Sequence, residues 1–129
     1  MAVKTSLPSS FKKIRLELAR EKGHPAGDPR RGYFIVVPLT EDRRIDVDMW
    51  KSYRDNFRVV RFRPGEDDEI GHLIHRPGGS WALRYDISGS NDEEAGFHFQ
   101  YERFDVGEYV SIREGDTMHT YQVITVLPV

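Results

Sequence analysis

Histidine is the residue type of this chain best suited to binding a ligand or a metal, and two of the five histidines are predicted to point inward. Gly115 and Asp116 fit the two central positions of a type II′ turn between two strands. With that register, alternation places His119 and Tyr121 on the apolar face of the hairpin, with Glu108 at its edge. A neutral imidazole beside a carboxylate is a common ligand pair for a divalent metal.

A second hairpin is predicted to turn at Pro77-Gly78, which fits a type II turn. If Arg76 pairs with Gly79, His72 also lies on an apolar face, although a shift of one residue would reverse that orientation. The competing interpretation is a pair of core histidines bonded to the backbone or to tyrosine. No metal or other cofactor is predicted. The candidate ligand-binding residues are His72, Glu108, His119 and Tyr121.

Basic residues gathered between positions 51 and 63 form a second candidate site, in which five lysines and arginines accompany one acid. Arg58, Arg61 and Arg63 are the candidate anion-binding residues, for a phosphate or a single-stranded nucleic acid with aromatic rings nearby for stacking. The competing interpretation is a solvated surface neutralised by the acidic run at 66–69. The formal net charge of −2 makes nucleic acid an unlikely partner for the chain as a whole.

Motifs of the common catalytic machineries are absent from the sequence. There is no P-loop, no Gly-x-Ser-x-Gly elbow and no Gly-x-Gly-x-x-Gly fingerprint. Because the chain has no cysteine, thiolate metal sites, iron–sulfur clusters and cysteine nucleophiles are excluded. No residue is therefore nominated as catalytic.

Strands are the elements predicted to position these residues. Residues 13–20 alternate strictly between polar and apolar, which favours a half-buried strand, with a helix as the alternative. Similar segments follow, separated by turn signals and by polar loops at 21–32 and 88–95. One of them, at 96–101, is expected to carry three aromatic rings on one face.

The pattern adds up to a mainly β fold, a single antiparallel barrel or sandwich of about seven strands with one short helix. The helix is predicted from Val47 to about Arg54, with Asp46 as its N-cap. Residues 1–10 are expected to be a flexible tail, and 11–129 a single β-rich domain. Aliphatic residues are few, so large rings must supply much of the core.

Location and partners follow from what the sequence lacks. No apolar run approaches the roughly 20 residues of a membrane span, and the first ten residues do not form a signal peptide. We therefore expect a cytoplasmic protein without a membrane partner. A protein or a small ligand is the expected partner, and the chain could be a monomer or a dimer.

Six strings of the chain stand out together: KIRLELAR at 13–20, Gly32-Tyr33, Pro38-Leu39, EDD at 66–68, IGHL at 70–73 and GEYVSI at 107–112. In these strings the chain resembles a family of small uncharacterised proteins from alphaproteobacteria. The resemblance implies a standalone bacterial protein of one domain. It implies no activity, substrate or catalytic residue.

The sequence favours a small non-enzymatic binding module. One alternative is a metal- or small-ligand-dependent barrel enzyme centred on inward histidines. The other is a single-stranded nucleic-acid module that uses the basic segment at 51–63.

Overall fold

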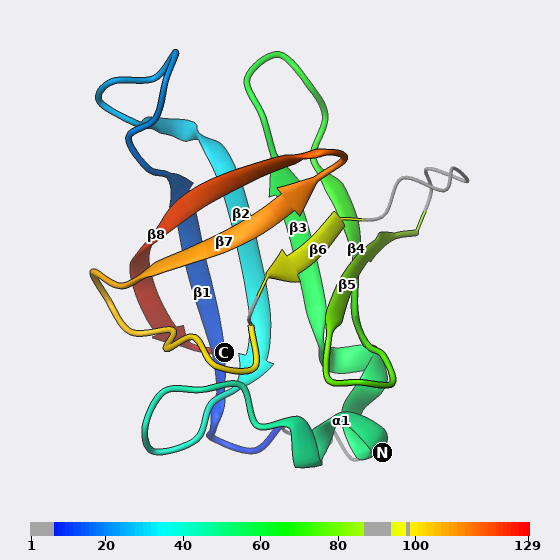
Figure 1. Cartoon of the computed structure of the whole chain (residues 1–129). Coiled ribbons are helices and arrows are strands. Elements are labelled where there is room, and N and C mark those ends of the chain that lie inside the picture. Colours follow the sequence, from blue (N-terminus) through cyan, green and yellow to red (C-terminus); the bar gives the residue numbers. More distant parts are fainter. Residues whose placement is uncertain (1–6, 87–93, 98) are drawn as a thin grey trace.

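The computed structural model describes residues 7–86, 94–97 and 99–129, which form a closed barrel of eight antiparallel strands (Figure 1). Each strand pairs with the next along the chain, and the last pairs with the first. The mainly β prediction is confirmed, with eight described strands in place of about seven. The strands are β1 (Phe11–Leu18), β2 (Asp28–Pro38), β3 (Arg58–Phe62), β4 (Glu69–His75), β5 (Trp81–Tyr85), β6 (Glu94–Phe97), β7 (Tyr109–Glu114) and β8 (Thr117–Pro128).

β1 shows how the period-two pattern builds the barrel. Its segment is a strand and not a helix, with Ile14, Leu16 and Leu18 buried inside. Arg15 and Glu17 lie on the outer face between them. The register against β8 shifts between Arg15 and Leu16, and such a bulge bends a strand, as closure of a barrel requires.

A helical segment at 47–56 closes one end of the barrel (Figure 1). Asp46 occupies the predicted N-cap position, but its side chain makes no capping hydrogen bond. The segment is held instead by Trp50, whose Nε1 donates to the carbonyl oxygen of Leu73 at 3.2 Å. Its parts are η1 (Val47–Met49), α1 (Trp50–Tyr53) and η2 (Arg54–Asn56).

Aromatic rings fill the interior beside the helical segment, and we call this part of the barrel the aromatic end. Phe57 and Trp81 stack with 5.8 Å between ring centroids, and Phe11 meets Phe57 edge-on at 5.9 Å. Phe99 and Phe104 form another edge-on pair at 5.2 Å. None of the five side chains is more than 1% exposed. Burying one such ring contributes roughly 1.5–3 kcal/mol, so this end is a main source of stability.

Several predicted boundaries differ from the structure. The loop at 21–32 ends earlier, because β2 begins at Asp28. The strand at 96–101 ends at Phe97; Phe99 then turns into the core, whereas Tyr101 is 68% exposed, so three rings do not share a face.

Two predictions fall partly on residues outside the described ranges. Of the predicted loop at 88–95, residues 88–93 lie outside them and the last two belong to β6. Of the predicted tail at 1–10, residues 1–6 lie outside them, and Leu7 packs against the core. No helix in the described part of the chain has the length and apolar character needed to cross a membrane.

The predicted register of the β7–β8 hairpin is confirmed. Ile112 pairs with His119, and Val110 pairs with Tyr121. Gly115 has a φ of 62°, as the first central position of a type II′ turn requires.

The predicted register of the β4–β5 hairpin is wrong by one residue. The turn itself is present, because the Gly79 amide donates to the Arg76 carbonyl at 3.1 Å. Gly79 is an extra residue in the turn, with a φ of 90°. Arg76 therefore pairs with Ser80, and its amide donates to the Ser80 carbonyl oxygen at 2.9 Å. A one-residue shift reverses the face of every side chain in β4.

The contact between Gly96 and Phe99 gives a first test of the aromatic end. A Cβ atom on Gly96 would lie 2.4 Å from the Phe99 ring. We expect Gly96→Ala to lower the free energy of unfolding in urea by about 1–3 kcal/mol, because it overpacks the core. Phe99→Leu makes room for the new methyl group, so the double variant should lose less than the sum of the single losses. Additive losses would contradict the contact.

Candidate functional site

The interior becomes polar toward the end opposite the helical segment, where β1 joins β2, β3 joins β4 and β7 joins β8 (Figure 1). Alternation explains the change: Arg61 and Arg63 follow buried Val59 at period two, and Glu114 follows buried Ile112. We call the linked side chains the polar cluster. Its members are Glu21, Tyr33, Arg61, Arg63, Glu69, Tyr85, Glu94, Glu114, His119 and Tyr121.

Two carboxylates and three tyrosine hydroxyls form the centre of the polar cluster. Glu94 accepts hydrogen bonds from Tyr33, at 3.0 Å, and from Tyr85. Glu114 accepts from Tyr33, at 2.6 Å, and from Tyr121. Burial, and then the neighbouring carboxylates, raise the pKa of all three tyrosines above its ordinary value, so they stay protonated. A phenol carries one proton, so Tyr33 cannot donate to both carboxylates at once.

Two guanidiniums bind the outer oxygens of the same carboxylates. Arg61 donates to Glu94 at 2.7 Å and to Glu69. Arg63 Nη2 donates to Glu94 at 3.3 Å and to Glu114 at 3.0 Å. Burial alone would lower the pKa of Arg61, but the carboxylates of Glu94 and Glu69 outweigh it and raise that pKa, so the guanidinium stays charged.

His119 connects the polar cluster to the loop between β1 and β2. Its Nδ1 lies 3.0 Å from Glu21 Oε1, and its Nε2 lies 3.8 Å from Glu114 Oε1. Beside these groups opens a cavity of about 70 Å³, the inner cavity, which His24 and Arg31 also line. One water occupies about 30 Å³ of liquid, so the inner cavity has room for about two waters or one small head group.

Carboxylates outnumber guanidiniums in the polar cluster. Four glutamates accompany two arginines, and Arg31 at the inner cavity is already paired with Asp28 at 3.3 Å. Even if His119 carries a proton, one negative charge is left over. Among the described residues, no group of three or more His, Cys, Asp or Glu side chains is placed to hold a metal ion. The polar cluster therefore has a surplus of carboxylates, and its described side chains lack metal-ligating geometry.

The structure brings together two of the four predicted ligand-binding residues. His119 and Tyr121 both belong to the polar cluster. His72 lies on the outer face, because of the extra residue in the β4–β5 turn, and its Nδ1 is 3.0 Å from Asp86 Oδ1. Glu108 immediately precedes β7, outside the polar cluster, and its side chain is 48% exposed and 4.0 Å from Arg103.

The three predicted anion-binding arginines do not share a face. Arg61 and Arg63 point into the barrel and bind glutamates. Arg58 is exposed on the outer face, where it pairs with His72 in the β3–β4 register. The positive charge counted along 51–63 therefore does not form one basic surface.

Tyr33, Tyr85, Glu94 and Glu114 are site residues that the sequence analysis missed. Alternation could have found three of them: Glu114 continues the inner face of β7, Tyr33 lies two residues before buried Ile35, and Tyr85 lies two residues after buried Leu83. Glu94 gave no such signal, because it ends the acidic run that was interpreted as a loop.

Comparisons with known proteins add no relative: no protein family, curated protein or solved structure matches this chain. A barrel of this kind can host many functions, so the function has to be inferred from the site itself.

Removal of the Tyr33 hydroxyl tests the centre of the polar cluster. Tyr33 is fully buried, and its hydroxyl touches both carboxylates. Tyr33→Phe should lower the free energy of unfolding by about 1–3 kcal/mol, because a buried carboxylate loses its donor. Tyr109→Phe removes a hydroxyl from a ring that is 57% exposed and should change stability by no more than about 0.5 kcal/mol. Equal losses in urea denaturation would show that the buried hydroxyl contributes nothing.

Glu102 is a half-buried carboxyl outside the polar cluster. Its Oε2 accepts a hydrogen bond from the Ser111 amide at 3.2 Å, while its buried Oε1 has no hydrogen-bond partner. Burial raises the pKa of Glu102 from 4.5 to about 7, and the Ser111 amide offsets this only in part.

The raised pKa of Glu102 predicts a pH dependence of stability. The protonated carboxyl favours folding below pH 4.5, and that contribution is lost as the pH rises from about 4.5 to about 7. Relative to Glu102→Gln, the wild type should therefore lose stability across this interval and stay level above it. Urea denaturation at a series of pH values measures the difference, with Glu108→Gln as the matched exposed control. A constant difference between wild type and Glu102→Gln would refute the shift.

Proposed function

We propose that this protein is a small non-enzymatic binding module, and that the polar cluster takes the cationic head group of a small organic ligand. The surplus of carboxylates in the polar cluster, four glutamates to two arginines, is the observation that carries the proposal. An ammonium or guanidinium group supplies both the missing positive charge and several hydrogen-bond donors. Eight-stranded barrels are just wide enough to hold one small ligand.

The arrangement of donors and acceptors supports a cation. Tyr33 faces Glu94 and Glu114 with a single proton, so one of its two contacts lacks a donor when both acids are ionised. Glu94 is 5% exposed and Glu114 14%, so little water is available to compensate. A cationic donor at the inner cavity would relieve this deficit.

The size of the inner cavity supports a head group over a whole organic molecule. Ligand pockets usually measure about 300–1,000 Å³, whereas this cavity measures about 70 Å³. The rest of the ligand would therefore lie outside the barrel end. Because no described group of side chains is placed to hold a metal, an organic cation is favoured over a metal ion.

The two alternative functions have less support. A barrel enzyme centred on two inward histidines keeps only His119, because His72 lies outside. For a nucleic-acid module, Arg58 is the only one of the three predicted anion-binding arginines that is exposed. We further propose a bacterial cytoplasmic protein, since a chain without cysteine suits a reducing compartment.

Butylamine and agmatine are suitable probes, with butyrate and butanol as the anionic and neutral controls. In ¹H–¹⁵N NMR titrations at low salt, the two amines should shift the backbone amides of Glu114 and His119, and the controls should not. Glu114→Gln should weaken amine binding by roughly tenfold, through loss of one charge-assisted contact.

Glu108→Gln makes the same charge change at an exposed carboxylate outside the polar cluster and should leave amine binding unchanged. Amine binding that both variants weaken equally would show attraction to net charge alone and would overturn the proposal. Butyrate binding at the same amides, or the absence of any shift with the amines, would overturn it as well.

A further inference from the structure

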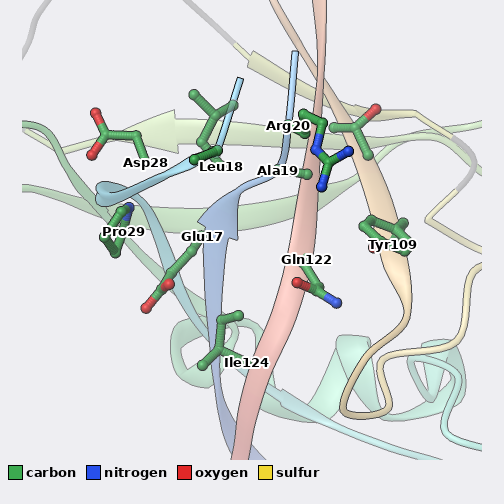
Figure 2. Close-up of a pocket in the computed structure, with 12 residues that line it drawn as sticks. Glu17, Leu18, Ala19, Arg20, Asp28, Pro29, Tyr109, Gln122 and Ile124 are labelled. Carbon is green, nitrogen blue, oxygen red and sulfur yellow. The ribbon is translucent and has the colours of Figure 1, made fainter. Parts of the chain in front are cut away.

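A second cavity lies on the outside of the barrel, between the β1–β2 loop and the outer faces of β7 and β8 (Figure 2). Its volume is about 760 Å³, within the range of about 300–1,000 Å³ that small-molecule sites occupy. We call it the outer groove. It is lined on one side by Asp28 and Pro29, and on the other by Tyr109 and Gln122.

Strand register fixes the floor of the outer groove. Glu17 pairs with Gln122, and Gln122 pairs with Tyr109, so the three side chains form a row across β1, β8 and β7. The Ala19 amide donates to the Thr120 carbonyl at 2.9 Å, which extends the pairing of β1 and places Arg20 next to the groove. Neighbouring strands lie roughly 4.8 Å apart, so the row spans about 10 Å, the size of a small ring with a substituent.

The opposite wall depends on a close backbone approach. Gly27 has a φ of 73°, and a Cβ atom there would lie 2.5 Å from the Leu18 carbonyl oxygen. Glycine is therefore required for the loop to return along β1 and lead into Asp28. Leu18, the last residue of β1, lines both the outer groove and the inner cavity.

Both carboxylates that line the outer groove are already paired with arginines. The Glu17 carboxylate is paired with Arg15 at 2.7 Å, and the Asp28 carboxylate lies 3.3 Å from both Arg30 and Arg31. The Arg30 amide and these guanidiniums lower the pKa of Asp28, which keeps it ionised.

Arg20 is the cation left over. It makes no hydrogen bond or ion pair with any residue that the structure describes. The groove and the partners of its acids thus bring together four guanidiniums and two carboxylates. A bound anion would complement this excess.

Tyr109 adds a flat apolar surface to the free cation. Its side chain is 57% exposed, its strand position pairs with Gln122, and its ring lines the same groove as Arg20 (Figure 2). Ile124 and Pro29 add apolar surface, while Thr120 and Gln122 offer polar groups. An exposed ring and an unpaired guanidinium in one groove suit a planar ring that carries an oxyanion, because one partner stacks and the other binds the charge.

We propose that the outer groove binds a small aromatic oxyanion, a planar ring bearing a carboxylate or a phosphate. The ring stacks on Tyr109 and the oxyanion binds Arg20. Gln122 Nε2, which already donates one hydrogen bond to the Gly107 carbonyl at 3.5 Å, donates its second to the oxyanion. This site is separate from the polar cluster and takes a ligand of the opposite charge.

Four probes with a common ring test the proposal: benzoate, phenyl phosphate, benzamide and benzylamine. In ¹H–¹⁵N NMR titrations, benzoate and phenyl phosphate should shift the amides of Thr120 and Gln122, and the tighter of the two identifies the natural oxyanion. Benzamide, which is neutral, should bind at least fivefold more weakly. Benzylamine should leave these amides unshifted, whether or not it binds at Glu114 and His119.

Variants separate the two contacts. Arg20→Gln should weaken binding of the anions roughly tenfold and bring them to the level of benzamide. Tyr109→Leu should weaken all ring probes that bind in the groove by a similar factor. The matched controls are Arg113→Gln, an exposed arginine of β7 outside the groove, and Tyr101→Leu, an exposed ring elsewhere; neither should change the affinity.

The proposal would be overturned if benzoate and phenyl phosphate bound as weakly as benzamide. It would also be overturned if Arg113→Gln reduced their affinity as much as Arg20→Gln does. Shifts of Glu114 and His119 by the anions, without shifts of Thr120 and Gln122, would overturn it together with the proposed cation site. Loss of amine binding alone would leave the outer groove unaffected, so the two proposals fail separately.

Discussion

The arrangement of the polar cluster depends on the hydroxyl of Tyr33, which lies between Glu94 and Glu114. Each carboxylate takes a further tyrosine and an arginine, so the bonds spread from this point around the barrel. Through Glu69, which binds Arg61, the network includes side chains from or next to every strand from β2 to β8. Closure of the barrel brings these side chains together, because every second residue of each strand points inward.

The two ends of the interior are stabilised by different interactions. At the aromatic end, stacked and edge-on rings stabilise the fold through burial, and they need no exact charge balance. At the other end, buried ions must find partners, and a well-packed apolar end is often as stable or more stable. A cluster that keeps surplus carboxylates at such a place gives up stability locally. That loss supports a role in binding.

Sequence reasoning succeeded where local geometry leaves few choices. The Gly115-Asp116 turn has two residues and one twist, so the register of β7 and β8, and with it the place of His119 and Tyr121, could be predicted. At Pro77-Gly78 the turn was right, but Gly79 added a bulge that no periodicity reveals, and His72 went to the wrong face. Arg61 and Arg63 were counted as surface charge because charge counting ignores which way a side chain points. Glu94 could not be found, since its partners come from distant strands and its neighbours in the chain are acidic.

The pairing of β1 with β8 has a consequence for how the chain is made. The first strand emerges from the ribosome more than 100 residues before its partner on that side, since Lys12 pairs with Pro128. Until then, one edge of the sheet is open and the inner face of β1 is covered on one side only. Such long-range closure is slow, and an exposed edge invites pairing with other chains. Until β8 pairs with β1, a newly made chain can therefore pair with other chains at that edge. In the closed barrel this edge is covered.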